Sequence, residues 1–227
     1  MSILTKEEIL KTVDSYEKLD FKDLKISYLI LKPNGSRHYK ATIKEIIRQQ
    51  YTIIGQFAIK DYETLNMALH ISQPESMRYI LPISQMYKDL YGNYGVLLII
   101  GKKNITYPNF ALQVVSLKRY LRARFSLEYV AYAFDTSKLG SKNEQQRLTI
   151  VDKEGKSTGN EYFKEEGTFM VIAVNEVHSP DEDINSLVKE IRLLSDMGLL
   201  DQANELPEET INNMMRYKTF EYVKDMK

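Results

Sequence analysis

Apolar residues in the first 60 positions switch between strand-like and helix-like spacing. Residues 26–31 are rich in strand-forming side chains and end at a turn-forming Lys-Pro-Asn-Gly sequence. Residues 43–48 then place isoleucines at helical spacing between charged residues, and residues 51–60 alternate as a second strand. The pattern therefore predicts the order strand, helix, strand.

The same switching continues after residues 61–90, which lack strand alternation, contain two prolines and predict two or three short helices. Residues 95–100 predict a strand apolar enough to be covered on both faces. Residues 110–124 predict a helix, residues 168–174 a last strand, and residues 183–194 a final helix. The combined order is the split βαβ pattern of an α+β, ferredoxin-like fold, an antiparallel sheet with helices on one face.

The rest of the chain predicts additions to this fold. Residues 1–20 predict a helical extension, because a Thr-x-x-Glu capping box precedes apolar residues at helical spacing. A β-rich insertion is expected at about residues 125–167, where glycines separate short strand-like runs. Those runs are residues 129–134 and 147–151. The domain itself is expected to span residues 21–200, and residues 201–227 a polar, partly helical tail.

Composition and charge exclude several classes of protein. A chain of 227 residues with 43% hydrophobic content can bury a sizeable core, so a disordered chain is excluded. Basic and acidic residues number 31 each, so no global field draws the protein to nucleic acid or to an anionic membrane. The absence of cysteine excludes disulfides and thiolate sites, and three histidines disfavour a zinc enzyme. No stretch approaches the roughly 18 apolar residues of a membrane span, so we expect a cytoplasmic protein.

Two polar motifs follow strand ends and carry the candidate chemistry. Lys32-Pro33-Asn34-Gly35 ends the first strand, and Asn175-Glu176-Val177-His178 follows the last, with Asp181 three residues farther on. In a ferredoxin-like sheet, the ends of the first and fourth strands lie close together. We therefore expect the lysine, the asparagine and the histidine of these motifs to surround one pocket.

In this order, and at these points in the predicted succession of strands and helices, the two motifs resemble those of the nucleoside diphosphate kinases. The first strand of that family ends in Lys-Pro-Asp-Gly, and its last strand runs into Asn-x-(Ile/Val)-His, followed closely by an Asp. The helical segment after the second strand also resembles the nucleotide-gripping helices of the family. The resemblance covers residues 24–60, 91–101 and 168–194, and it hardly touches residues 102–167.

The resemblance implies a phosphotransferase that moves the γ-phosphate of a nucleoside triphosphate to a nucleoside diphosphate through a phosphohistidine. His178 would be the nucleophile, a role that suits a neutral imidazole, and Glu190 would orient it from a position displaced by one residue. Lys32 would supply a point charge to the phosphates, and Asn175 would help to hold the ribose. Mg²⁺ would be held through the nucleotide phosphates. The family also implies a homo-oligomer.

The chain departs from the family pattern at several positions. His178 is followed by Ser-Pro-Asp instead of Gly-Ser-Asp, and a tyrosine expected near the phosphates is absent at the His70-Ile71 position. Tyr79 is the nearest candidate for stacking on the base. The Gly-Thr-Ile-Arg loop that brings an arginine to the phosphates has no recognisable copy. Its charge could come from other basic residues, for which the candidates are Lys118, Arg119, Arg122 and Arg147.

Three function classes remain open at this point. The first is the active phosphotransferase, and the second is a catalytically weak or inactive nucleotide-binding regulatory module of the same fold. The third is an RNA binder that uses the sheet face, ranked last because the strands lack an aromatic RNA-binding signature and the net charge is zero. A histidine at a strand end is also often structural, and a basic helix end is often only a solvated face.

Overall fold

The computed structural model places most of the predicted elements. It describes residues 4–16, 23–36, 38–71, 84, 88, 92–105, 110–125, 129–135, 147–151, 169–173, 176–201, 206 and 211. The predicted helices within residues 72–91 and the predicted tail helix lie outside these described residues, apart from isolated positions. No helix of the described part is long and apolar enough to cross a membrane.

Four antiparallel strands form the main sheet, in the order β2-β3-β1-β7. They are β1 (Lys25–Leu31), β2 (Thr52–Ile59), β3 (Gly95–Lys102) and β7 (Val177–His178). The helix α3 (Tyr39–Arg48) connects β1 to β2, and α6 (Phe110–Phe125) follows β3. This strand order and these connections confirm the predicted α+β, ferredoxin-like fold class.

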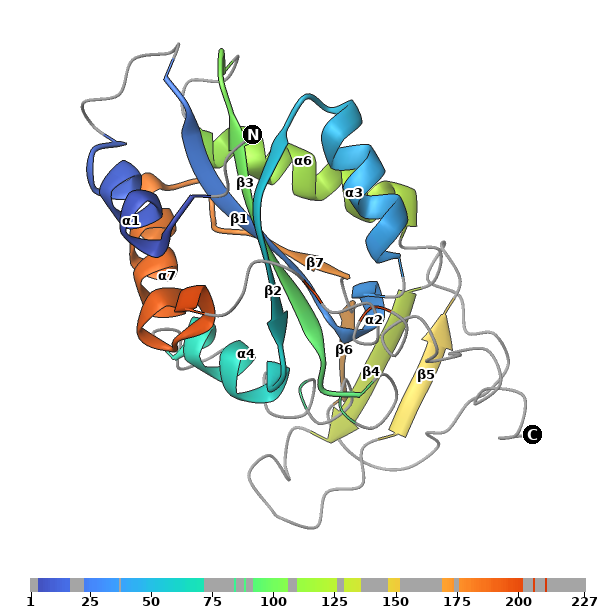
Figure 1. The fold of residues 1–227 in the computed structure, drawn as a ribbon. Helices are drawn as coiled ribbons and strands as arrows, with labels where there is room; N and C mark the ends of the chain where they lie inside the picture. The colour runs from blue at the N-terminus through green and yellow to red at the C-terminus, as the bar shows by residue number, and fades with distance from the viewer. Residues whose placement is uncertain are drawn as a thin grey trace.

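Helices cover both faces of the main sheet (Figure 1). The crossover helices α3 and α6 lie on one side, as the split βαβ pattern predicts. A second layer, formed by α1 (Lys6–Asp14) and α7 (Ile184–Asp196), covers the opposite side. All seven residues of β1 are buried, which requires cover on both faces. The layer formed by α1 and α7 therefore extends the predicted arrangement, in which helices cover one face.

The two helices of the second layer begin at side-chain caps that the sequence encodes. Thr5 and Glu8 form the predicted capping box at the start of α1. The Asp183 carboxylate accepts a hydrogen bond from the Ser186 backbone N–H at 2.9 Å and starts α7. This cap fixes the residue at which α7 begins. Farther along the same helix, Glu190 accepts a hydrogen bond from Tyr28 of β1.

A separate three-stranded sheet corrects the prediction for the last strand. β4 (Tyr129–Asp135), β5 (Arg147–Val151) and β6 (Phe169–Ala173) pair antiparallel in the order β5-β4-β6. The run predicted as the last strand of the main sheet is therefore β6 of this second sheet. The fourth strand of the main sheet is β7, which has only two residues and is too short to show alternation. His178 consequently lies within the strand and not after it.

Candidate functional site

The two sequence motifs meet at the end of β1. The Lys32 backbone N–H donates to the Glu176 carbonyl oxygen at 2.9 Å, directly beyond the point where Leu31 pairs with Val177. Gly35 approaches so closely that a Cβ atom on it would stand 2.4 Å from the same carbonyl oxygen. Only glycine fits this contact without a shift of the backbone. The predicted convergence of the first and fourth strand ends is therefore present.

A single helical turn, α2 (Pro33–Ser36), holds the lysine motif in place where the sequence predicts only a turn. Pro33 occupies its first position, where a missing N–H costs nothing. The Ser36 hydroxyl donates to the Lys32 carbonyl oxygen at 3.1 Å, and the Ser36 N–H donates to the same oxygen at 2.9 Å. The backbone of Lys32 is thus fixed on both sides.

His178 belongs to a chain of three polar side chains from β7, β1 and α7. The Tyr28 hydroxyl oxygen lies 3.2 Å from Nε2 of His178, and the same hydroxyl donates a hydrogen bond to Oε2 of Glu190. Oε2 of Glu190 itself lies 3.9 Å from Nε2, beyond hydrogen-bond distance. Tyr28 therefore connects the histidine to the carboxylate.

Burial keeps this histidine neutral at physiological pH. It lowers the pKa of His178 to about 4, with Lys32 adding to the effect and Glu190 opposing it. Burial and the neighbouring Glu190 carboxylate also raise the pKa of Tyr28 well above its usual value, so the tyrosine keeps its proton. The side chain of His178 is nevertheless 19% exposed, so solvent reaches the ring.

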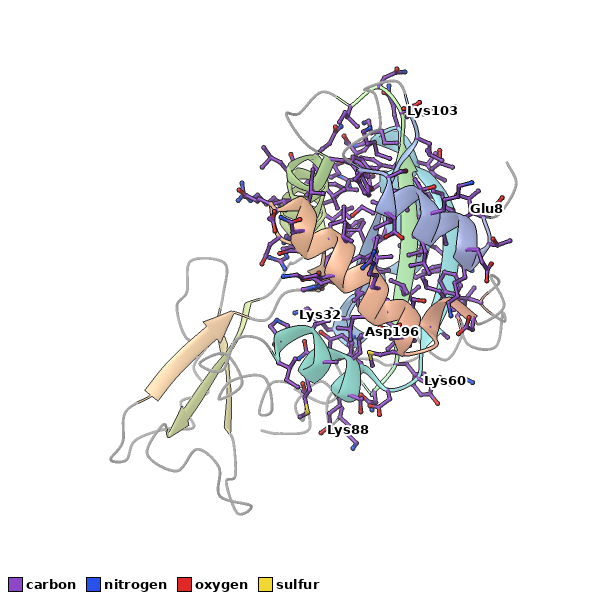
Figure 2. The ribbon with its side chains drawn as sticks, turned by 90° about the vertical axis from the view of Figure 1, so that its left-hand side faces the viewer. Glu8, Lys32, Lys60, Lys88, Lys103 and Asp196 are labelled. Carbon is purple, nitrogen blue, oxygen red and sulfur yellow. The ribbon has the colours of Figure 1, made fainter. Side chains whose placement is uncertain are left out.

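Lys32, which directly follows β1, and two cations of α6 lie near this chain. Burial first, then Arg122 and Lys118, lower the pKa of Lys32 to about 7. The pKa of Lys118 is also lowered, by burial first and then by Arg122, while Asp181 and Glu190 act in the opposite direction. In Figure 2, Lys32 is labelled next to the helix α4 (Tyr62–His70) and below α7. Positive charges that lower one another's pKa are stabilised by an anion.

Arg122 also ties α6 to the strand that carries the histidine. Its Nε and Nη2 atoms donate to the Val177 carbonyl oxygen at 2.9 and 2.6 Å. The hydroxyl of Ser179, on the other side of His178, donates to the Pro180 carbonyl oxygen at 3.0 Å and is buried. The backbone on both sides of the histidine is therefore held in place, and the serine of the motif is engaged locally.

A second histidine lies against the first. His70 ends α4 (Tyr62–His70), and its ring meets that of His178 edge-on, with centroids 5.9 Å apart. Its Nδ1 atom lies 2.7 Å from the Asn66 carbonyl oxygen, within donating distance. The buried Asn66 side chain is itself held by the Tyr62 and Ser84 hydroxyls, at 3.2 and 2.9 Å. His70, at the position where the resemblance would place a tyrosine, is thus held by the backbone of its own helix.

The structure brings together some of the predicted site residues and not others. His178 and Glu190 are joined through Tyr28, and Lys32, Lys118 and Arg122 interact electrostatically. Arg119 instead pairs with the exposed Glu182 at 2.9 Å. Asn175, Tyr79 and the side chain of Arg147, at the start of β5, lie outside what is described.

Two contributors to the site, Tyr28 and His70, were not predicted from the sequence. The only signal for Tyr28 is a tyrosine in the middle of a largely aliphatic strand. Among the residues that the structure describes, no group of three His, Asp or Glu side chains is placed to hold a metal ion. No family model matches the chain, and neither a curated protein nor a solved structure does. The function must therefore be argued from the site itself.

Proposed function

We propose that the chain is a nucleoside diphosphate kinase-like phosphotransferase that works through a phosphohistidine on His178. The observation that carries the proposal is a neutral, oriented histidine beside the cations Lys32, Lys118 and Arg122. A neutral imidazole has a lone pair available for attack on a terminal phosphate. Phosphoryl transfer otherwise needs positioning and compensation of spread negative charge, which basic side chains supply.

In this proposal the γ-phosphoryl group of a nucleoside triphosphate moves to the imidazole and then to a nucleoside diphosphate. A ring nitrogen attacks the γ-phosphorus, and the bond to the bridging oxygen breaks and leaves a diphosphate. The acceptor diphosphate then attacks the phosphohistidine and restores the neutral ring. Mg²⁺ would be held through the phosphates of the nucleotide, and no step depends on a metal ligand from the chain.

Lys32 fits the role of a phosphate contact because its charge is sensitive to what binds. With a pKa of about 7, it is only partly protonated at neutral pH before the nucleotide binds. A polyphosphate beside it favours the charged form, so binding and protonation of Lys32 support each other. Arg122 keeps its charge throughout.

The alternative is a nucleotide-binding regulatory module of the same fold that is catalytically weak or inactive. Two observations favour it: the family's arginine loop has no copy, and Asp181 and Glu190 place negative charge near Lys118. The third class, an RNA binder on the sheet face, loses support. All of β1 and all but the last residue of β3 are buried, so these strands offer no open face on which bases could stack.

Labelling with radioactive ATP and Mg²⁺ tests the proposal. Wild-type protein is expected to acquire acid-labile, base-stable label that a nucleoside diphosphate removes. The variant His178→Asn is expected to acquire none while it still binds ATP in calorimetry. His38→Asn is the matched control, because His38 precedes α3 and is not a member of the Tyr28–His178–Glu190 chain; its ring stacks on Phe125 and its Nε2 atom lies 3.8 Å from Oε1 of Glu176.

The outcomes separate the two candidate functions. Wild-type protein that binds ATP and never acquires label supports the regulatory module and overturns the kinase proposal. Label that persists in His178→Asn means that another residue is the nucleophile.

A further inference from the structure

Tyr28 is a buried polar residue in a position that a purely apolar side chain could fill. It lies in the middle of β1, opposite Ile99 of β3, and its side chain has no solvent exposure. Burying a hydroxyl costs free energy unless the group is hydrogen-bonded. Here the hydroxyl bridges His178 and Glu190, two residues from different elements that do not hydrogen-bond each other.

Counting protons in this bridge assigns the tautomer of the histidine. Tyr28 has a single hydroxyl proton, which it donates to Oε2 of Glu190. The tyrosine oxygen is then left as an acceptor towards Nε2 of His178 at 3.2 Å. A neutral imidazole has one N–H group, so Nε2 carries the proton and Nδ1 carries the lone pair.

We propose that Tyr28 is a positioning residue, which holds His178 in the Nε2–H tautomer and links the imidazole ring to the negative charge of Glu190. The inference rests on the proposed function and adds to it a residue that the sequence motifs do not contain. In the first step, the Nδ1 lone pair forms the N–P bond and the electron pair of the breaking P–O bond leaves on the diphosphate. Nε2 keeps its proton, and the imidazole ring becomes positively charged. Glu190, which is linked to the ring by the Tyr28 hydroxyl, offsets this charge. In the second step, the acceptor oxygen attacks phosphorus and the electron pair returns to Nδ1.

The variant Tyr28→Phe isolates this role because it removes one oxygen atom and leaves the ring. Nε2 then loses its acceptor, and Glu190 at 3.9 Å is too far to replace it without movement. We expect a mixture of tautomers and phosphoenzyme formation that is slower by roughly 10- to 100-fold, as for the loss of a hydrogen bond to a charged group. Tyr51→Phe is the matched control. Tyr51 is also a buried tyrosine, and its hydroxyl donates to the Gln113 carbonyl oxygen at 3.1 Å.

Nitrogen-15 NMR of histidine-labelled protein reads the tautomer directly and needs no nucleotide. Wild type and Tyr51→Phe are expected to show the Nε2–H form of His178, and Tyr28→Phe a mixture. A second variant, Glu190→Gln, keeps the Tyr28 hydroxyl but removes the negatively charged acceptor of its hydrogen bond. It is expected to shift His178 towards the Nδ1–H form, and it provides the test if Tyr28→Phe does not fold.

The readouts distinguish failure of this inference from failure of the proposed function. An Nδ1–H tautomer in wild type, or an unchanged tautomer and labelling rate in Tyr28→Phe, overturns the role of Tyr28 and leaves the phosphohistidine standing. Wild-type protein with the expected tautomer but no phosphoenzyme overturns the proposed function, and the catalytic meaning of Tyr28 fails with it.

Discussion

Two clusters in this molecule each contain a tyrosine that donates to a glutamate near basic side chains, and they balance their charges differently. Between α3 and α6, Glu45 accepts a hydrogen bond from Tyr120 at 2.6 Å and pairs with Arg48 and Arg124, both at 3.0 Å. The Tyr120 hydrogen bond is the largest cause that lowers the pKa of Glu45; desolvation comes next and opposes it, and Arg124 and Arg48 lower the pKa further. Each charge in this cluster faces a charge of opposite sign.

In the middle of β1, Tyr28 again donates to a glutamate, but the cations near the end of that strand lie close to one another. Lys32 lies near Arg122 and Lys118, and each of the two lowers its pKa further after burial has done so. The first cluster is typical of structural ion pairing. In the second, Arg122 and Lys118 add to burial in disfavouring the charged form of Lys32, while Asp181 and Glu190 act in the opposite direction on Lys118. Strongly perturbed titratable groups of this kind concentrate at functional sites. The comparison indicates that the sign of the neighbouring charges distinguishes the candidate site from the structural ion pairs between α3 and α6.

The largest effect is expected from His178, which should make the free energy of unfolding depend on pH. This dependence tests the comparison between the two clusters. Its pKa is about 4 in the folded protein, while that of a histidine in an unfolded chain is about 6.5. Between these values the unfolded chain binds more protons, so stability falls as the pH is lowered from 6.5 towards 4. The loss is on the order of 3 kcal/mol in wild type and is absent in His178→Asn.

Urea unfolding of both proteins across this pH range measures the effect. The Glu45 cluster provides an internal contrast, because a lowered carboxyl pKa contributes stability that is lost only at lower pH, as Glu45 becomes protonated in the folded state. Parallel pH profiles for wild type and His178→Asn between pH 6.5 and 4 would show that His178 is not held neutral by burial.

How far the sequence predicts the molecule can be seen at particular residues. The run that forms β1 and the capped helices α1 and α7 follow from spacing and caps, and the meeting of Lys32 with the histidine motif follows from sheet topology. Spacing does not predict which sheet a strand joins, so the prediction that residues 168–174 form the last strand of the main sheet is wrong. A period of two places Tyr28 on one face of β1, but which helix covers that face depends on tertiary packing. The bridge to Glu190 therefore could not be predicted.

A smaller effect is expected for Lys32→Met, which should change binding and stability in opposite directions. Losing a charged phosphate contact should weaken ATP binding by about 1.5–3 kcal/mol in calorimetry. Removing a partly buried cation beside Arg122 and Lys118 should raise the free energy of unfolding by roughly 1 kcal/mol at pH 7. Because Lys32 loses its proton in the folded state above its lowered pKa, this stabilisation should shrink as the pH rises from 7 to 10.5. Unchanged ATP affinity would remove the phosphate role, and a loss of stability at pH 7 would show that Lys32 supports the fold.

The smallest expected effect comes from the equivalent change in the balanced cluster, Arg124→Met. Arg124 pairs with Oε1 of Glu45 at 3.0 Å, and its side chain is 48% exposed, so solvent screens most of the attraction. The melting temperature should fall by at most a few degrees, and by less at high salt, because screening weakens exposed ion pairs. ATP affinity should be unchanged, since Glu45 retains Tyr120 and Arg48 as partners and none of the three belongs to the site around His178. If Arg124→Met weakened ATP binding as much as Lys32→Met, the nucleotide would be contacting the α3–α6 surface, and the distinction drawn between the two clusters would be wrong.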